Sequence, residues 1–420
     1  MSTIVDSAVK TRIVYVNHTG QVSGAEKVLM NILRSLDRGC YQPIVVCPAD
    51  GCLSEEAAAE GIPWIAIRPI RARFSRNPKQ ILKSMGELCK GVLSLRKVLR
   101  TVAPDMIHAN TLRAGLATSL ATLGTGRNVI WHVHDTLPRH PLSTLIRLFA
   151  YLDRRTRLVA VSRATARSFS GRLPFKGRMK TVYNGVELNK FPFKEKGQSP
   201  FRKEFHLSQD DFLFCAIGQI CERKGLLELI EAFRQVRAAA PQVHLAIVGS
   251  VVFQHERDYS GLLYAAARVP ELTGSVHFTG EMDDVYPALE AADLLVLNSR
   301  DEPFGLVLIE AMSSGTPVLA TRVGGIPEIV TDGKDGWLID PGDVRALAAK
   351  LLELSRDRPA LAKVAEIAQR TTCPRFSMEG FQSRLRRLYE ELEPKSDLRW
   401  NPCNQTARAQ SMTRRGGPYA

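Results

Sequence analysis

"DEPFGLVLIEAMSSGTPVLATRVGGIPE", residues 301–328, decides the fold of this chain. An apolar run at Leu294–Leu297 precedes it and predicts a buried strand. Pro303 predicts a helix that begins at Phe304 or Gly305, and Val318–Ala320 predicts the next strand. A strand, a helix and a strand in this order form a parallel unit with a right-handed crossover.

The same alternation of short apolar runs and helical patterns extends in both directions from this stretch, and predicts two doubly wound α/β domains. A chain of 420 residues also exceeds the length at which one core keeps growing. The expected strands of the first domain are Arg12–Val16, Pro43–Cys47, Met106–His108, Val129–Val133 and Leu158–Val161. Those of the second are Phe212–Ile217, His244–Val248, Val276–Phe278, Leu294–Leu297, Val318–Ala320 and Gly336–Ile339.

The domain boundaries follow from composition. Residues 1–190 form the expected N-terminal domain, and residues 201–375 form the C-terminal one. Between them, "FPFKEKGQSP" at 191–200 has the proline, glycine and charges of an exposed linker. The last helical pattern covers 376–393. The tail at 394–420 has no periodicity and is predicted to be disordered.

Ligands of open α/β sheets bind outside the carboxyl ends of the strands, so two facing domains of this type predict a cleft lined by strand-end loops. The first strand of the second domain ends in "IGQICERKG", in which Gly218 permits a tight turn. Arg223 and Lys224 follow, just before a predicted helix. Two cations beside a helix N-terminus predict a diphosphate site. The alternative is that both are solvated loop charges.

Two carboxylates stand eight positions apart in the opening stretch. Glu302 is expected at the strand-end rim, and the helix beyond it can turn free N–H groups toward a ligand at Gly305. Glu310 falls inside the helix, among apolar residues, where a carboxylate is costly to bury without hydrogen-bond donors. A pair of sugar hydroxyls could be those donors, and a structural partner such as an arginine or a backbone amide is the alternative.

The chain is basic, with a formal net charge of +14. So basic a surface attracts anionic lipid, nucleic acid or phosphorylated small molecules. Residues 68–100 carry ten Lys or Arg against one acid, Glu87, and Lys79–Arg100 has helical apolar spacing beside a cationic face. Such a helix could rest on an anionic membrane. The alternative is a helix that covers the sheet and turns a solvated basic face outward.

Other classes of protein are disfavoured. Neither a spanning apolar segment nor a secretory signal is evident, so we expect a cytoplasmic protein, with contact at the inner face of the plasma membrane as an option. Eight cysteines form no CxxC pair and accompany no histidine cluster, which argues against a zinc site and favours reduced thiols in the core. No metal ligands are therefore predicted.

Together, "GQICERKG", the carboxylate pair in its "FGLVLIEAMSSGTPVLATRVGGIPEIV" context and the N-terminal "SGAEKVLMNIL" resemble the family 4 retaining glycosyltransferases. The resemblance extends from Arg12 to about Glu393 and implies the GT-B fold, in which the helix at 376–393 packs back on the first domain. It also implies a UDP- or GDP-sugar donor held mainly by the C-terminal domain. Members of this family use no DxD-bound metal, and this sequence has no DxD.

The resemblance implies a role for each matching residue. Glu310 would accept hydrogen bonds from the donor ribose, and Glu302 would contact hydroxyls near the reacting carbon. Arg223 and Lys224 would neutralise the leaving diphosphate in place of a metal, helped by Gly218 and by the backbone N–H groups of Phe304, Gly305, Leu306 and Val307. The family's N-terminal Gly-Gly turn, which lies near the donor phosphates and the acceptor, corresponds to Ser23 and Gly24, so the first glycine is missing here and Gly24 remains as the donor-binding residue.

The stretch "WHVHD" at 131–135 ends a predicted strand and places His134 at the rim of the cleft, where it matches a family histidine near the donor sugar and the acceptor. A structural histidine at the rim is the alternative, and a covalent relay and front-side attack both remain open as mechanisms. The expected acceptor is a glycan or a lipid-linked glycan in cell-surface polysaccharide synthesis. Alternatives for the whole chain are a sugar-nucleotide epimerase or phosphorylase on this fold, or a non-catalytic basic binding protein.

Overall fold

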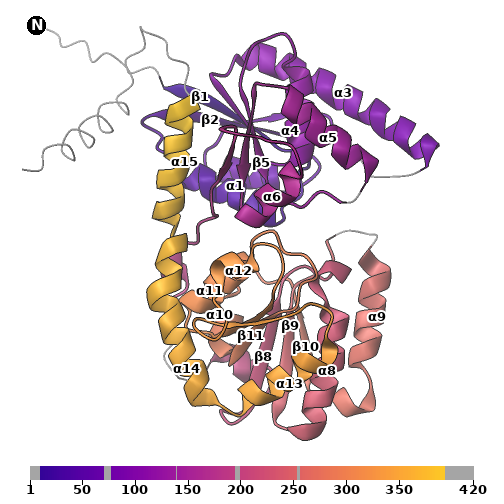
Figure 1. The fold of residues 1–420 in the computed structure, drawn as a ribbon, viewed down its shortest axis with the longest axis vertical. Helices are drawn as coiled ribbons and strands as arrows, with labels where there is room; N and C mark the ends of the chain where they lie inside the picture. The colour runs from indigo at the N-terminus through magenta and orange to yellow at the C-terminus, as the bar shows by residue number, and fades with distance from the viewer. Residues whose placement is uncertain (1–9, 71–76, 139, 194–198, 253–255, 393–420) are drawn as a thin grey trace, which may run out of the picture. The chain divides into compact units, whose positions relative to one another are not determined.

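The computed structural model describes residues 10–70, 77–138, 140–193, 199–252 and 256–392. The chain divides into two compact units (Figure 1). The N-terminal unit comprises the described residues up to Val161, together with 165–182 and 382–392. The C-terminal unit comprises 162–164 and 183–381. The segment predicted as a disordered tail, 394–420, lies outside the described residues.

The chain enters the C-terminal unit at Tyr183, before the linker expected at 191–200. The described ends of that segment belong to the C-terminal unit instead. The hydroxyl of Ser313 donates to the backbone carbonyls of Leu188 and Phe191, at 3.2 and 3.0 Å, and so fixes the chain there. Composition indicates where a chain is polar, but it does not show such a contact over long sequence separation.

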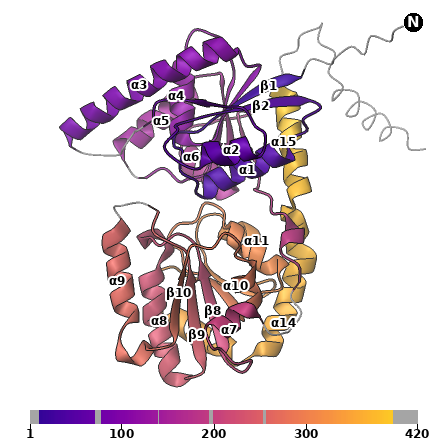
Figure 2. The ribbon, with the colours of Figure 1, turned by 180° about the vertical axis from the view of Figure 1, so that it is seen from behind.

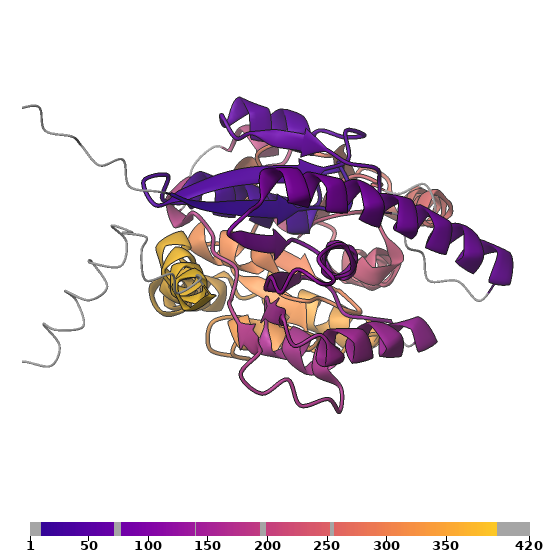
Figure 3. The same ribbon diagram turned by 90° about the horizontal axis from the view of Figure 1, so that it is seen from above.

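The N-terminal unit is built on a parallel sheet with the strand order β3-β2-β1-β4-β5-β6-β7. Its strands are β1 (Thr11–Val16), β2 (Tyr41–Cys47), β3 (Trp64–Ala66), β4 (Met106–Ala109), β5 (Val129–Val133), β6 (Thr156–Ala160) and β7 (Met179–Thr181). Its helices are α1 (Gly24–Ser35), α2 (Leu53–Ala59), α3 (Pro78–Val102), α4 (Leu112–Ala121), α5 (Pro141–Leu152) and α6 (Arg163–Ser170), of which α6 begins in the C-terminal unit. Figure 3 shows that α3 extends beyond the strands.

The two faces of this sheet differ in character, because successive side chains of a strand point to opposite faces. On one face Val14, Ile107 and Trp131 join the apolar core formed with α3, α4 and α5. Tyr15, His108 and His132 alternate with these residues and therefore lie on the other face. This second face is polar in the middle of the sheet, although all three side chains are fully buried.

The C-terminal unit has a parallel sheet with the order β10-β9-β8-β11-β12-β13. Its strands are β8 (Phe212–Ile217), β9 (Val243–Val248), β10 (Val276–Gly280), β11 (Leu294–Leu297), β12 (Val318–Thr321) and β13 (Trp337–Ile339). Its helices are α7 (Pro200–Glu204), α8 (Leu226–Ala239), α9 (Arg257–Ala267), α10 (Tyr286–Ala291), α11 (Leu306–Ser313), α12 (Ile326–Ile329), α13 (Val344–Ser355) and α14 (Arg358–Ile367). The strand order reverses between β8 and β11, which is where ligands bind in such sheets.

The last helix, α15 (Met378–Leu392), is shared between the units. Its first turn belongs to the C-terminal unit, and the part from Gln382 onward belongs to the N-terminal unit. In that part Leu385, Leu388 and Tyr389 are buried, and Tyr389 contacts residues of β1 and β2, beside which the helix lies (Figures 1 and 2).

Most predicted strands are present with small shifts at their ends, but β3 and β7 were not predicted. Both are three-residue strands at the sheet edges, and neither has a fully buried residue, so neither produces an apolar run. The prediction of reduced thiols in the core holds for four cysteines that are free and buried, Cys47, Cys215, Cys221 and Cys373, whereas Cys52 and Cys89 are free but exposed. It is wrong for Cys40, which is disulfide-bonded, because spacing along the chain does not show which thiols come together.

Candidate active site

Two predicted site residues form an ion pair at the point where the strand order of the C-terminal unit reverses. Lys224 follows β8 and Glu302 follows β11, and the Lys224 Nζ lies 2.6 Å from the Glu302 Oε2. Arg223 joins them, because its NH1 lies 3.6 Å from the same carboxylate oxygen and donates to the carbonyl of Asp301 at 2.9 Å. Two cations thus face one carboxylate, so the cluster keeps one net positive charge.

Glu302 is ionised although it is only 8% exposed. Burial alone would raise the pKa of its carboxyl group, but the charges of Lys224 and Arg223, together with hydrogen bonds from Lys224 and Ser299, outweigh burial and hold the pKa below its ordinary value. The hydroxyl of Ser299 donates to the same carboxylate at 3.3 Å. Lys224 is nearly as buried as Glu302, whereas the side chain of Arg223 is 41% exposed. Arg223 is therefore the cation that an anion from solution can reach.

The backbone that carries Glu302 is held by a glycine turn whose contact the sequence did not predict. Gly324 has φ +52°, and a Cβ built there would stand 1.9 Å from the carbonyl oxygen of Glu302. The next glycine, Gly325, donates its N–H to that oxygen at 2.9 Å. Ser162 supports the following residue, since its hydroxyl donates to the carbonyl of Pro303 at 2.7 Å. The adjacent glycines in "RVGGIPE" suit a turn, but the sequence does not show that this turn contacts Glu302.

The start of α11 lies next to this turn. Gly305 is the N-cap of the helix, with φ +102°, and Leu306 and Val307 are its first two residues. Their N–H groups lack acceptors within the helix and suit a ligand oxygen. The side chain of Phe304 is 3% exposed and lies against Tyr183 and Phe376, so only its backbone can serve a ligand.

The remaining predicted residues of this unit flank the ion pair. Gly218 has φ +145°, and a Cβ there would come within 3.3 Å of Lys224 Cε, so a side chain would crowd this lysine. Glu310 lies on α11 and is only half-buried, which differs from the expectation of a carboxylate enclosed by apolar neighbours. Its partly exposed position reduces the cost of its charge and allows a polar ligand to approach.

Gly24 belongs to the N-terminal unit, where it is the first residue of α1. Ser23 is the N-cap, with φ −135°, so the missing first glycine leaves no strained conformation. The N–H and hydroxyl of Ser23 donate to Glu26 Oε2 at 3.1 and 2.6 Å, in a capping box. A Cβ at Gly24 would meet nothing within 4 Å, so the structure leaves open space beside it.

His134 also belongs to the N-terminal unit and follows β5, as predicted. It is 8% exposed, and its Nε2 has no hydrogen-bond partner in the part of the chain that the structure describes. Burial lowers the pKa of its imidazole to about 3, so the ring is neutral at physiological pH. A buried, unpaired ring nitrogen beyond the carboxyl end of a strand suits a hydrogen bond with a bound molecule.

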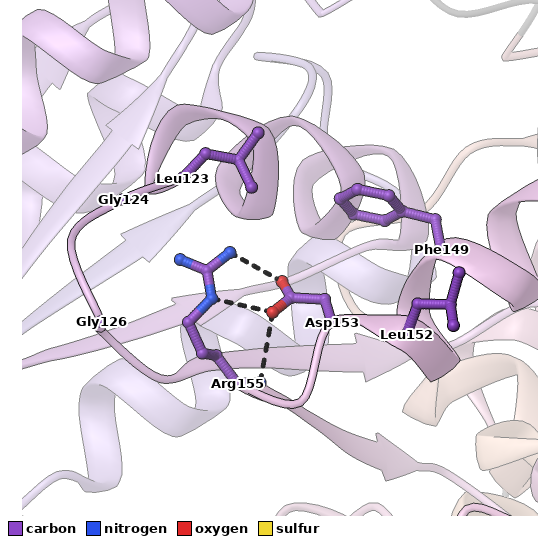
Figure 4. A pocket seen from close by; sticks show the side chains of 7 residues that line it. All are labelled: Leu123, Gly124, Gly126, Phe149, Leu152, Asp153 and Arg155. Atoms are coloured by element: carbon purple, nitrogen blue, oxygen red, sulfur yellow. Dashed lines mark hydrogen bonds and ion pairs between the residues drawn. The ribbon is translucent and has the colours of Figure 1, made fainter.

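An alternative site among the described residues would be a metal-binding group or a separate hollow. Within the described ranges, no group of three or more His, Cys, Asp or Glu is arranged to hold a metal ion. An open hollow of about 500 Å³ is lined by Leu123, Gly124, Gly126, Phe149, Leu152, Asp153 and Arg155 (Figure 4). These loops precede β5 and β6, so the hollow lies at the amino ends of the strands. None of the predicted site residues lines it.

Two family models match the chain. The one described as "Glycosyl transferases group 1" matches residues 198–371, and the one described as "Glycosyltransferase Family 4" matches residues 22–190. The D-inositol 3-phosphate glycosyltransferase 2 of Catenulispora acidiphila is 30% identical over 366 residues, which cover 80% of this chain and 83% of that protein.

Shorter matches and solved structures point to the same group. The N-acetyl-alpha-D-glucosaminyl L-malate synthase of Bacillus anthracis is 28% identical over 214 residues, which cover 51% of this chain and only about half, 54%, of that enzyme. The match with the lipopolysaccharide core glycosyltransferase LpsE of Rhizobium meliloti covers 46% of that protein. Anabaena HepE, solved in complex with UDP-glucose, is 27% identical, with a TM-score of 0.78 over 90% of this chain and 99% of HepE. The chain belongs to the group 1, family 4 glycosyltransferases and has their GT-B fold.

Proposed function

We propose that this protein is a retaining, metal-independent glycosyltransferase. It transfers a sugar from a UDP- or GDP-sugar to a glycan or lipid-linked acceptor in cell-surface polysaccharide synthesis. The observation that carries the proposal is the convergence of Lys224 and Arg223 on Glu302 at the switch point of the C-terminal sheet. The UDP-glucose bound to HepE supports a nucleotide-sugar donor.

The two cations, Lys224 and Arg223, have different roles because they differ in burial and in their contacts with Glu302. Lys224 is committed to the Glu302 carboxylate, and so it orients that acid and keeps it ionised. Arg223 is accessible and can make charge-assisted hydrogen bonds with the diphosphate as the glycosidic bond breaks. The N–H groups at the start of α11 add donors with a favourable dipole. Fixed positive charge in this arrangement performs the task that a metal ion performs in other transferases.

The remaining site residues receive complementary roles. Glu302 accepts hydrogen bonds from sugar hydroxyls near the reacting carbon, and Glu310 accepts them from the ribose. His134, neutral because of burial, uses its unpaired Nε2 toward a hydroxyl of the donor sugar or of the acceptor. Since Glu302 is already bound by Lys224, it acts as a positioning group more readily than as a nucleophile. This arrangement favours front-side attack, in which the leaving phosphate oxygen takes the acceptor proton.

A panel of UDP-, GDP- and ADP-sugars tests the donor, because a ligand that binds only the folded protein raises its melting temperature. We expect the sugar nucleotides of one base, uracil or guanine, to raise the melting temperature of the protein. We also expect nucleotide release to continue in EDTA. The anomeric configuration of the product, read by NMR, tests retention. If EDTA abolishes release, or if no nucleotide diphosphate stabilises the protein, the proposal is wrong. Heparin or RNA affinity that persists under saturating UDP or GDP would favour the basic binding protein instead.

The outer surface of α3 supports the proposal of a lipid-linked acceptor, because it is suited to contact with a membrane. Three apolar side chains there are exposed, namely Leu82 at 72%, Met85 at 57% and Leu93 at 67%, beside exposed lysines that include Lys83 and Lys90. Leu95 and Leu99 are buried, so part of the helix covers the sheet while its outer leucines face solvent. No helix of the described segments combines the length and the apolar character needed to cross a bilayer.

We therefore propose peripheral contact with an anionic membrane, in which the lysines attract the headgroups and the leucines insert at the interface. Co-sedimentation with vesicles of phosphatidylglycerol tests this contact. Replacement of Leu82 and Leu93 by serine should reduce binding at equal charge, and neutral phosphatidylcholine vesicles should bind less. Equal binding of the variant and the parent protein would exclude α3 as the contact.

A further inference from the structure

A chain of four buried polar side chains crosses the N-terminal unit and ends beside His134. The hydroxyl oxygens of Tyr15 and Tyr389 are 3.2 Å apart, and the Tyr389 hydroxyl lies 2.7 Å from His108 Nδ1. The Nε2 of His108 lies 3.3 Å from His132 Nδ1. The ring centroids of His132 and His134 are 4.0 Å apart, so the chain reaches the proposed site.

The arrangement is dictated by the strand register. Tyr15 pairs with His108 across β1 and β4, and His108 pairs with Ile130 across β4 and β5. His132 lies two residues beyond Ile130 and therefore occupies the same face, as does His134 after a further two residues. Tyr389 completes the chain from α15, whose rotation is fixed because Leu385 and Leu388 are also buried.

Burial keeps these groups neutral. Desolvation lowers the pKa of His108 to about 3 and holds the pKa of His132 well below its ordinary value, and the neighbouring imidazoles add repulsion in the same direction. Burial raises the pKa of both tyrosine hydroxyls. Each of the four groups therefore carries one proton that can form a hydrogen bond, and three bonds are to be made.

These protons can be arranged in two ways. In the first, Tyr15 donates to Tyr389, Tyr389 to His108 Nδ1, and His108 Nε2–H to His132 Nδ1, so the His132 proton is on Nε2. In the second, every donor is reversed, and the His132 proton is on Nδ1. The first leaves one buried group unpaired, the Nε2–H of His132, which has no partner within the described ranges.

The second arrangement leaves two buried groups unpaired, the hydroxyl proton of Tyr15 and the bare Nε2 of His132. Tyr15 forms no other hydrogen bond among the residues that the structure describes. Because each buried group without a partner costs stability, the first arrangement is favoured. The proton of His132 is then on Nε2, in the ring whose centroid lies 4.0 Å from that of His134.

We infer that Tyr389, His108 and His132 are positioning residues, and that the hydroxyl of Tyr389 fixes His132 as its Nε2–H tautomer and thereby orients the neutral imidazole of His134. The catalytic consequence rests on the proposed function, in which His134 contacts the donor sugar or the acceptor. The C-terminal helix, distant in sequence from β5, thus contributes to the geometry of the transfer site within its own unit.

Two matched substitutions separate this role from packing. Tyr389→Phe removes the only proton that His108 Nδ1 receives. Both arrangements then leave the same three groups unpaired, the Tyr15 hydroxyl, His108 Nδ1 and His132 Nε2, so the tautomer preference is lost. Tyr15→Phe removes an equally buried hydroxyl, but the Tyr389 proton still reaches His108 and the preference remains. Long-range proton–nitrogen NMR of the full chain with labelled histidine reads the tautomer, and the spectrum of His132→Gln identifies the His132 signals.

We expect a single Nε2–H tautomer of His132 in the parent protein and in Tyr15→Phe, and a mixture in Tyr389→Phe. With UDP-glucose as the probe, Tyr389→Phe should lower kcat for UDP release about 10-fold, as when the outer partner of a functional histidine is removed, with an unchanged KM. Tyr15→Phe should remain near the parent value. If the nucleotide screen selects another donor, that sugar nucleotide replaces UDP-glucose.

The outcomes distinguish this inference from the proposed function. A single tautomer retained in Tyr389→Phe overturns the inference whatever the activity. Mixed tautomers with an unchanged kcat overturn the link to the reaction, while transfer by the parent protein upholds the proposed function. A parent protein that turns over no sugar nucleotide removes the proposed function and the catalytic link with it, and NMR still decides whether Tyr389 sets the tautomer.

Discussion

Lys224 and Glu302 are 78 residues apart in the chain, and their side chains meet at 2.6 Å. The pair joins the loops after β8 and β11, which are neighbours in the sheet although two strands separate them in sequence. The acid and the cation therefore occupy fixed positions before any substrate arrives, which is the preorganisation that electrostatic catalysis needs.

Removal of Lys224 should destabilise the fold as well as slow transfer. In Lys224→Ala the buried carboxylate of Glu302 loses its closest counter-charge, and the loss of one partner of a buried pair costs about 3–5 kcal/mol. Chemical denaturation measures this loss. The double variant Lys224→Met/Glu302→Gln removes both charges and should recover most of the stability, whereas transfer should stay low. No recovery would mean that Lys224 stabilises the fold through other contacts.

Arg223→Ala should raise the barrier to transfer by about 2–4 kcal/mol, the effect of removing one preorganised donor. Stability should change little, because the Arg223 side chain is 41% exposed. Arg300→Ala is the control, since Arg300 is an exposed cation of the same region that pairs with Glu222 and Glu228. Steady-state kinetics of both variants measure the rate of transfer. An equal decrease of this rate in Arg223→Ala and Arg300→Ala would refute the specific role of Arg223.

Glu310→Gln should weaken nucleotide binding by about 1.5–3 kcal/mol, as expected for the loss of a charge-assisted hydrogen bond. Titration calorimetry with UDP and GDP measures the change. Because Glu310 is half-buried at the surface of α11, the melting temperature of the free protein should change little. An unchanged nucleotide affinity would make Glu310 a structural residue.

Gly324→Ala should lower stability by more than Gly333→Ala, and should impair transfer as well. Both glycines have positive φ, so both substitutions carry backbone strain of roughly 1–3 kcal/mol. Only Gly324 adds a steric clash, because its new Cβ would stand 1.9 Å from the Glu302 carbonyl, while nothing lies within 4 Å at Gly333. Thermal unfolding and kinetics of the two variants isolate the clash. Equal losses of stability and activity in the two variants would show that the loop around Gly324 shifts to relieve the clash without a measurable loss of free energy.

Acid should destabilise the protein below about pH 6.5. The pKa of His134 is lowered from 6.5 to about 3 in the folded state, so between these values the unfolded chain binds more protons than the folded one. The contribution of neutral His134 to the free energy of unfolding is present above pH 6.5 and is lost as the pH falls. The free energy of unfolding then decreases by up to about 1.4 kcal/mol per pH unit for this one proton. Denaturation from pH 5 to 8 should show a smaller slope in His134→Gln, and parallel slopes would contradict the buried neutral imidazole.

The sequence predicted what local patterns determine. The positions of the major strands and helices follow from apolar runs, and the rim placement of Glu302 follows from the strand that ends just before it. The contacts of Glu302 with Lys224 and Gly324 could not be predicted from the residues alone, because they depend on which strands become neighbours. The bond between Tyr389 and His108 is hidden for the same reason, since α15 has no local signal that shows where it docks.

The crossing of α15 from one unit to the other has a practical consequence for dividing this protein into fragments. An N-terminal fragment ending at Val182 would lack the part of the helix that brings Leu385, Leu388 and Tyr389 to its sheet. It would bare the rings of Tyr15 and His108 to water and aggregate readily. A permuted gene that joins residues 382–392 to the start of β1 should instead yield an autonomously folding half.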